Sequence, residues 1–255
     1  MRILSGTPLA LRCACCSCPL GPGCFPGSAD AAHLQELERL VEHTMPVHAG
    51  HLLFRQGDRF QYLTAIRLGT VKTYAVDREG REQTLGFHMP GDFLGLSAID
   101  EERYPCNAVA LDTVSLCRLP FHEIAELARR MPMLQATLFR LMSRDIARAT
   151  QLACNSMADE RLAAFLIDMA DRMAARGYAP NRWQFTMSRM DIASYLRLAP
   201  ETLSRLLRRF QAEGLVTVEG RDVEVRGRDR LQALAAADPM RRSAAAGVQV
   251  RNQAA

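Results

Sequence analysis

The sequence predicts an α+β protein in three parts: an antiparallel β-roll, then a long helix, then a winged helix-turn-helix. Three observations lead to this prediction. Between about Val47 and Leu119, short apolar runs alternate with Gly and Asp at regular spacing, which is typical of a small antiparallel sheet. After Pro132, apolar residues recur at three- and four-residue steps for more than five helical turns. From Ser188 onward, two short helical patterns are joined by a brief turn and followed by an alternating hairpin.

Composition limits the class of protein. The chain has 255 residues, of which 48% are hydrophobic, and a formal net charge of +4. This is enough for a real core, so disulfides are not needed to hold the fold. No apolar run reaches the roughly 18–20 residues that cross a bilayer. The apolar stretch at the start is interrupted by Ser5, Gly6 and Pro8. We therefore expect a cytoplasmic protein with no export signal and no membrane partner.

Residues 1–29 form a cysteine-rich arm without helical or strand periodicity. Its segment "CACCSCPLGPGC", Cys13 to Cys24, holds five of the eight cysteines of the chain. In a reducing compartment, clustered thiols bind metal or carry out redox chemistry more often than they form disulfides. We therefore expect the arm to be ordered by whatever its cysteines hold.

Residues 30–130 are expected to form the roll. A short helix, capped by Ser28 or Asp30, precedes strand-like runs such as "YLTAIRLGTVKTYAV" and "EQTLGFHMPGDFLG". Glycines at the ends of these runs suit turns that need a positive φ.

Residues 131–157 are expected to form one long helix with a narrow apolar seam. Such a helix can lie on the core of its own domain or pair with a second copy as a coiled coil. Its position between two dissimilar halves favours pairing. The expected dimer contacts are Leu134, Leu138, Leu141, Met142, Ile146 and Ala149.

Residues 158–235 are expected to form the winged helix-turn-helix, and residues 236–255 a disordered tail. Ser188 can cap the first helix with Asp191 at its third position, and Pro200 suits the first turn of the second helix. Residues 180–212 carry a local charge of +4, which suits DNA phosphates. A solvated charged face is the alternative interpretation. The expected DNA-binding residues face outward from the second helix and are Glu201, Ser204, Arg205, Arg208 and Arg209.

The segments "FHMPGDFLG", "DERLAAF" and "PETLSRLLRRFQ" give the chain a specific resemblance over about residues 13–235. It resembles the FNR (fumarate and nitrate reduction regulator) branch of the cyclic AMP receptor/FNR family of bacterial transcription regulators. This resemblance implies a cyclic-nucleotide-binding-like roll, a homodimer, and an oxygen-responsive regulator that senses through a 4Fe–4S cluster. It also implies binding to palindromic, TTGAT-like sites in double-stranded DNA, with Glu201, Ser204 and Arg205 at the base-reading positions.

The resemblance also implies the cluster ligands. The family pattern C-x2-C-x5-C, with a fourth cysteine just before a Pro-Phe pair, matches Cys15, Cys18, Cys24 and Cys117. Cys13 and Cys16 are left over, and either one could replace a ligand. Thiolates also bind zinc in tetrathiolate sites, so cysteine count alone does not separate the two metals.

Binding of a cyclic nucleotide is not expected. Relatives that bind one carry Glu after the second glycine of a G-x-x-G turn, and an Arg-Ser pair further on. Here Leu96 follows Gly95, and the tripeptide Pro105–Asn107 stands where the Arg-Ser pair would be.

The expected function is therefore regulation of transcription, in which oxygen destroys the cluster, frees the arm and weakens dimer pairing. The loop "VDREGREQT" is a candidate contact for RNA polymerase, with a solvated hairpin turn as the alternative. A zinc-stabilised or ligand-independent regulator of the same family is the second hypothesis. A cysteine-based redox enzyme is disfavoured, because the arm has no activating His or Lys and the chain has no nucleotide-binding loop. We therefore expect a protein that is not an enzyme.

Overall fold

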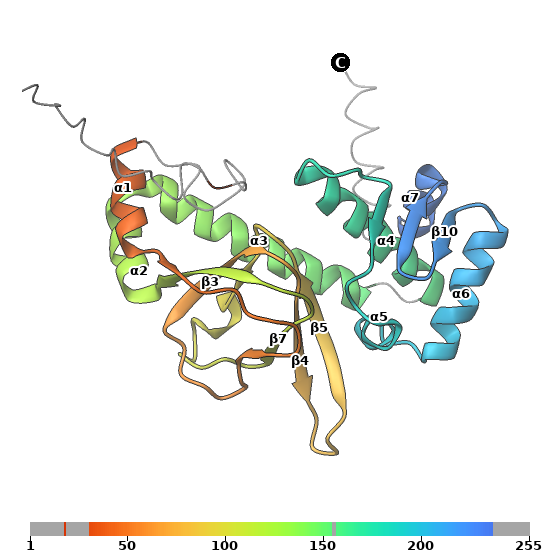
Figure 1. Ribbon diagram of the computed structural model, residues 1–255, viewed down its shortest axis with the longest axis horizontal. Helices are drawn as coiled ribbons and strands as arrows, with labels where there is room; N and C mark the ends of the chain where they lie inside the picture. The colour runs from red at the N-terminus through yellow and green to blue at the C-terminus, as the bar shows by residue number, and fades with distance from the viewer. Residues whose placement is uncertain (1–17, 19–30, 155–156, 237–255) are drawn as a thin grey trace, which may run out of the picture.

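The computed structural model describes residues 18, 31–154 and 157–236. The β-roll lies at one end of the molecule and the helix-turn-helix unit at the other, with a long helix running between them (Figure 1). The predicted α+β class and the order of its three parts are confirmed. The expected ligands Cys15 and Cys24, the alternatives Cys13 and Cys16, and residues 237–255 of the expected tail lie outside the described residues.

The roll consists of two four-stranded antiparallel sheets, with strand orders β1-β8-β3-β6 and β2-β7-β4-β5. A short helix, α1 (Ala31–Leu40), leads into it. The first sheet contains β1 (Glu42–His43), β3 (Tyr62–Leu68), β6 (Phe93–Leu94) and β8 (Ser115–Pro120). The second contains β2 (Leu52–Phe54), β4 (Val71–Val76), β5 (Glu82–His88) and β7 (Asn107–Ala110). One apolar cluster inside the roll draws on both sheets, and it includes Ile66, Val71, Ala108 and Leu116.

Helices close the outer side of the first sheet. Helix α2 (Phe121–Arg130) directly follows β8, and α3 (Pro132–Cys154) starts two residues later. The start of α3 packs into a cluster with Leu63, Leu119, Ile124 and Leu127, and Leu134 is 2% exposed there. The expected dimer contact Leu134 thus lies in the core of its own roll, which leaves almost none of its side chain accessible to a partner helix. Periodicity alone could not assign it, because a core-facing row and a partner-facing row share the same spacing on one helix.

The C-terminal unit is a winged helix-turn-helix. Its three-stranded sheet has the order β10-β11-β9, and its two central helices carry the turn. Residues such as Ile192, Leu203, Leu207 and Phe210 form its core. Its elements are α4 (Ala158–Ala175), β9 (Arg182–Gln184), α5 (Arg189–Tyr195), α6 (Pro200–Ala212), β10 (Val216–Glu219), β11 (Asp222–Val225) and α7 (Arg228–Ala235).

Local sequence signals fix the ends of these helices. The Ser188 hydroxyl accepts a hydrogen bond from the Asp191 amide, and the Asp191 carboxylate accepts one from the Ser188 amide, so the predicted capping box is present. Pro200 begins α6, where a missing N–H group costs little. Helix α5 ends with Arg197 in the left-handed region, at φ 53°. The Leu198 amide then bonds to the Ala193 carbonyl, which is the pattern that Gly usually supports.

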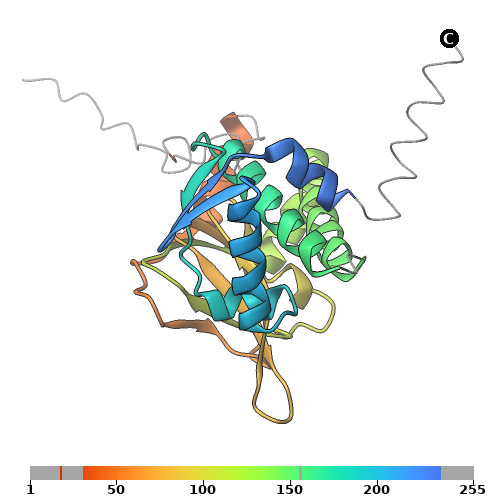
Figure 2. The same cartoon turned by 90° about the vertical axis from the view of Figure 1, so that its right-hand side faces the viewer.

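The two ends of the molecule share an apolar contact. The core cluster of the C-terminal unit includes Phe87 and Met89 from the end of β5 and the turn that follows. The Phe87 ring lies 5.3 Å from that of Tyr195 in α5 and 6.3 Å from that of Phe165 in α4. The C-terminal unit is therefore docked on the roll, and the β4–β5 hairpin projects away from the rest of the molecule in both views (Figures 1 and 2).

Candidate functional site

Cys117 is the one expected cluster ligand that lies in a strand. It sits in β8 between two ladder partners, His43 of β1 and Ala65 of β3. Its Sγ atom is 3.4 Å from Nδ1 of His43. Burial raises the pKa of the Cys117 thiol, the neighbouring Cys18 raises it further, and Arg67 opposes them. Cys18, the described residue of the arm, is therefore near enough to Cys117 for the two thiols to interact electrostatically.

The described residues do not complete a metal site. Among residues 31–154, 157–236 and Cys18, no three His, Cys, Asp or Glu side chains are grouped so that they could hold a metal ion. Cys18 and Cys117 supply two of the four expected sulfur ligands, and both are half-buried free thiols. Cys106 is different: it is buried, and burial raises its pKa to about 11, so it stays an inert thiol.

His43 is a neighbour of this site that sequence reasoning missed. It lies in a strand of only two residues, which carries no alternation that could be read from the sequence. Its register opposite Cys117 comes from the pairing of β1 with β8, which joins segments 74 residues apart.

Helix α6 offers an exposed polar side and a buried apolar side. Glu201, Ser204, Arg205 and Arg208 are exposed, as the sequence predicted. The Ser204 hydroxyl donates to the Pro200 carbonyl at 3.0 Å within the same helix. Such a surface, a helix with free basic and acidic side chains, has the shape and chemistry to enter the major groove of DNA.

Arg209 has a different environment from the other arginines of α6. Its Nη2 atom is 3.0 Å from Oδ2 of Asp159 at the start of α4, and its Nε is 3.6 Å from Glu213. Its guanidinium is already paired with two carboxylates. The sequence could not indicate this pairing, because Asp159 is 50 residues away.

Helix α5, the first helix of the motif, faces the roll. Nζ of Lys72 on β4 lies 2.7 Å from Oδ1 of Asp191 and 3.2 Å from Glu82. Burial alone would lower the pKa of Lys72, but the hydrogen bonds and charges of Asp191 and Glu82 raise it above its usual value. The Thr84 amide donates to the Ser194 hydroxyl at 2.9 Å. The only lysine of the chain thus joins the roll to the helix-turn-helix.

The long helix α3 has two apolar faces. Leu138, Leu141 and Met142 are half-buried and continue the row of Leu134 onto the roll. Phe139 and Ile146 lie seven residues apart and are 61% and 65% exposed. Seven-residue spacing places them on one face, as in a coiled coil, and Ala149 is exposed on the next step of that face.

Two residues at which the sequence departs from nucleotide-binding relatives, Leu96 and Cys106, are buried in the roll. Leu96 lies in a 3-10 turn, Leu96–Ala98, and its side chain is buried in the core, as is Cys106. Stacked rings of Phe54 and Tyr104, with centroids 3.8 Å apart, wall a nearby cavity of about 210 Å³. Ligand pockets usually have about 300–1,000 Å³.

None of the helices in the described ranges is both long enough and apolar enough to cross a membrane. Two family models match the chain: the cyclic nucleotide-binding domain over residues 44–131 and the Crp-like helix-turn-helix domain over residues 160–234. These ranges coincide with the roll plus α2 and with the winged helix-turn-helix.

Curated relatives extend the match over most of the chain. The transcriptional activator protein anr of Pseudomonas aeruginosa is 42% identical over 224 residues, covering 87% of this chain and 92% of the relative. The fumarate and nitrate reduction regulatory protein of Escherichia coli K12 is 39% identical over 237 residues, covering 92% and 94%. Among solved structures, FixK2 from Bradyrhizobium japonicum matches with a TM-score of 0.69 and 25% identity, covering 76% of this chain and 96% of that one.

Identity at this level over nearly the whole chain, with a roll and a helix-turn-helix in the matching order, identifies a family of transcription regulators. The redox-enzyme hypothesis is thereby excluded, because the members of this family regulate transcription and are not enzymes. The chain belongs to the FNR branch of the cyclic AMP receptor/FNR family of DNA-binding transcription regulators.

Proposed function

We propose that the protein is an oxygen-responsive transcription regulator that holds a 4Fe–4S cluster and binds palindromic, TTGAT-like DNA as a homodimer. The observation that carries the sensing part of this proposal is the position of Cys18 beside Cys117. Cys18 lies close enough to Cys117 for its charge to raise the pKa of that thiol, and thiols are soft ligands suited to iron–sulfur chemistry.

The chemistry of the donor set, four cysteine thiols, suits such a cluster. Cys117 would provide the ligand fixed on the roll, and Cys15, Cys18 and Cys24 would provide those of the arm. When bound, the cluster would supply an oxygen-labile link between the arm and the roll. Burial and the neighbouring Cys18 raise the pKa of the Cys117 thiol in the free protein, and a bound metal would stabilise its thiolate instead. His43 would lie next to the Cys117 sulfur at the edge of this site.

The dimer is proposed to form through α3. Support comes from the exposed row of Phe139 and Ile146, together with Ala149 and part of Met142. Leu138 and Leu141 would contribute less to the interface, because their own roll already covers part of each side chain. A twofold pair of α3 helices would place two α6 helices on a palindrome, with half-sites about 34 Å apart.

DNA is proposed to be read by the exposed side of α6. Glu201, Ser204 and Arg205 lie near its N-terminal end, which is the part of a recognition helix that meets base edges. Arg208, further along, is free for phosphate. Arg209 is proposed to neutralise phosphate only in part, since Asp159 already pairs with it.

The roll and its β4–β5 turn have two further proposed properties. The protein uses no cyclic nucleotide, which is supported by the packed Leu96 and by the small cavity in the roll. The β4–β5 turn contacts RNA polymerase, which is supported by its projection from the roll. Its shape is fixed by Asp77, which accepts hydrogen bonds from the Glu79 and Arg81 amides.

The sensing part is tested by purifying the protein without oxygen and recording its visible spectrum, iron content and zinc content. We expect a brown protein that loses its colour in air and its dimeric mass with it. Cys117→Ser should abolish the colour, whereas Cys106→Ser, which removes a buried thiol of the same roll, should keep it. Cys15→Ser and Cys13→Ser, compared in the same way, identify the register of the arm. A colourless wild-type protein that contains one zinc ion would overturn the proposal in favour of the zinc-stabilised regulator.

A further inference from the structure

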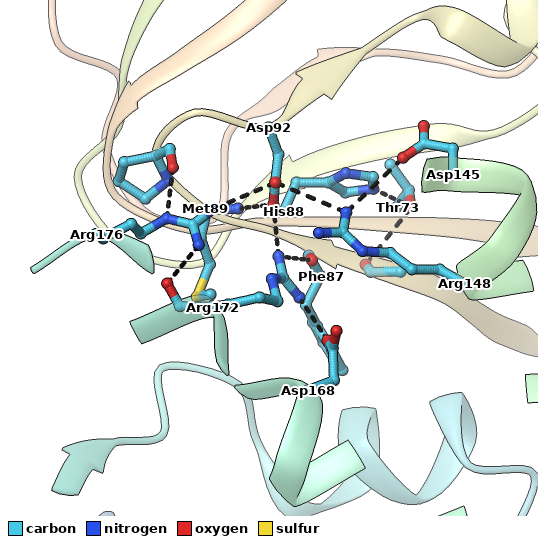
Figure 3. A network of polar contacts seen from close by, with 12 residues as sticks. Thr73, Phe87, His88, Met89, Asp92, Asp145, Arg148, Asp168, Arg172 and Arg176 are labelled. Atoms are coloured by element: carbon cyan, nitrogen blue, oxygen red, sulfur yellow. Dashed lines mark hydrogen bonds and ion pairs between the residues drawn. The ribbon is translucent and has the colours of Figure 1, made fainter. Parts of the chain in front are cut away.

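A single buried carboxylate, Asp92, joins the roll to the long helix α3 and to α4, the first helix of the C-terminal unit (Figure 3). It lies in the turn between β5 and β6 and is 8% exposed. Its Oδ2 atom is 2.5 Å from Nη2 of Arg172 on α4, and its Oδ1 atom is 3.2 Å from Nη2 of Arg176 on the same helix's C-terminal end. Nη1 of Arg148 on α3 is 3.7 Å from Oδ1. Three arginines outside the roll therefore converge on one carboxylate inside it.

The geometry around Asp92 is fixed from both sides. Within the roll, the Met89 amide donates to Oδ2 at 2.9 Å, so the carboxylate cannot rotate freely. On α4, Arg172 also donates to the Phe87 carbonyl at 2.7 Å, and Arg176 donates to the Pro90 carbonyl at 2.5 Å. Two guanidinium groups, one helical turn apart, thus bind the segment from Phe87 to Asp92.

The charges leave Asp92 ionised. Burial alone would raise the pKa of its carboxyl, but the guanidinium groups of Arg172, Arg148 and Arg176 outweigh it and hold the pKa far below the usual range. An ion pair buried in this way contributes little net stability, because desolvation offsets much of the attraction. Losing one partner is costly, however, because the remaining charges stay buried and unpaired. Such a network adds little to the free energy of unfolding, but it favours one orientation of the C-terminal unit on the roll over other orientations.

The same network leaves the DNA-reading side open. Contacts to the roll come from α4 through Arg172 and from α5 through Asp191 and Ser194, while Glu201, Ser204, Arg205 and Arg208 on α6 are exposed. The docked orientation is therefore one in which α6 can approach DNA.

We propose that Asp92 is a positioning residue for DNA binding: through Arg172 and Arg176 it holds the helix-turn-helix unit in the orientation in which α6 can meet DNA. Asp92 itself does not touch DNA. The proposal rests on the chain binding DNA as its family does, and it is independent of the metal that the cysteines hold. If only a fraction of the molecules keeps the docked orientation, the apparent dissociation constant for DNA equals the intrinsic constant divided by that fraction.

The test uses Asp92→Asn in the full-length, anaerobically purified protein, with affinity for a palindromic DNA fragment as the main measurement. We expect the affinity to fall by about 10- to 100-fold, as the docked population falls by the same factor. The visible spectrum and the dimeric mass should stay unchanged. Asp58→Asn is the matched control, because it removes an exposed carboxylate of the roll that accepts a hydrogen bond from the Arg55 amide of its own turn. The control should bind DNA as the wild type does.

A second measurement separates positioning from general damage. If Asp92 acts through Arg172, the double variant Asp92→Asn with Arg172→Gln should bind DNA no more weakly than the weaker single variant. Hydrogen exchange should become faster in the turn from Met89 to Asp92 and in α4, and stay unchanged in the α6 amides. If Asp92→Asn does not fold, Arg176→Gln takes its place in the test, because it leaves the Asp92–Arg172 pair intact. We then expect a smaller loss of DNA affinity.

The wild-type protein gives the reference for interpretation. A wild type that fails to bind DNA contradicts the proposed function and not this inference. If the wild type binds and Asp92→Asn binds equally well or more tightly, the positioning role is wrong. Additive losses in the double variant overturn it as well, since Asp92 and Arg172 would then act independently.

Discussion

The two faces of α3 should respond differently to the same kind of truncation. Ile146 is 65% exposed in the single chain and Leu134 is 2% exposed. The substitution Ile146→Ala removes three carbons. Full burial of three carbons contributes about 2.4 kcal/mol of hydrophobic free energy, at about 0.8 kcal/mol per CH₂ group. A partner subunit can bury only the exposed two thirds of the Ile146 side chain. The lost contribution to dimer formation is therefore about 1.6 kcal/mol per subunit. In a twofold dimer the change occurs twice, for a total of about 3 kcal/mol.

This amount corresponds to a dimer dissociation constant raised by about two orders of magnitude. Sedimentation equilibrium of the anaerobic protein over a range of concentrations measures it. Urea unfolding of the monomer should change by less than about 0.5 kcal/mol, since Ile146 is a surface residue there. Leu134→Ala should do the opposite and lower the free energy of unfolding by about 2–5 kcal/mol.

Met133→Ala is the matched control on the same helix. Met133 is 57% exposed but lies off the seven-residue row of Phe139 and Ile146. Equal weakening of the dimer by Met133→Ala and Ile146→Ala would refute the assignment of the faces. So would a Leu134→Ala protein that loses dimer affinity and keeps its full stability.

Three further predictions concern stability and DNA recognition. Arg197→Gly should raise the free energy of unfolding by about 0.5–1 kcal/mol, because it relieves a left-handed backbone conformation at an exposed helix end. Urea denaturation measures this, and a lower stability would contradict it. Burial, aided by Arg172 and Arg148, lowers the pKa of His88 from 6.5 to about 4, although the residue keeps some solvent exposure. Between pH 6.5 and about 4, His88 therefore binds a proton in the unfolded chain but not in the folded one. The free energy of unfolding falls as the pH falls through this range, by up to about 1.4 kcal/mol per pH unit. His88→Gln should flatten that slope, and an unchanged slope would show that other groups cause it. Arg205→Ala should weaken binding to the specific DNA site by about 1–3 kcal/mol and relax the choice at one base pair. Equal weakening on all sequences in a competition assay would show that Arg205 contacts phosphate only.

Much of the fold could be predicted because its signals are local. Alternation and turn glycines mark the roll, and a capping box formed by Ser188 and Asp191 marks the start of α5. The expected hairpin is formed by β10 and β11, which alternate on both sides of a turn at Gly220 and Arg221. Each of these features depends on residues a few positions apart.

The candidate site could be predicted only where a motif carries it. The outward side of α6 follows from helical periodicity, and Cys117 follows from the family pattern. The pairing of His43 with Cys117, of Lys72 with Asp191 and of Asp92 with Arg172 could not be predicted, since each joins segments about 70 to 120 residues apart. A lone His, Lys or Asp carries no period, and its partner is chosen by the packing of the two units.

The charge of the helix-turn-helix illustrates how packing changes what composition means. Residues 180–212 hold six arginines, which would suggest a uniformly basic surface. In the structure these arginines have different partners. Arg209 pairs with Asp159. The Arg189 guanidinium lies 5.0 Å from the centre of the Phe185 ring and donates to the Gly220 carbonyl. The acidic Asp191 faces Lys72 on the roll, whereas Arg205 and Arg208 face solvent. The motif therefore has one side built to dock on the sensor roll and another built for DNA.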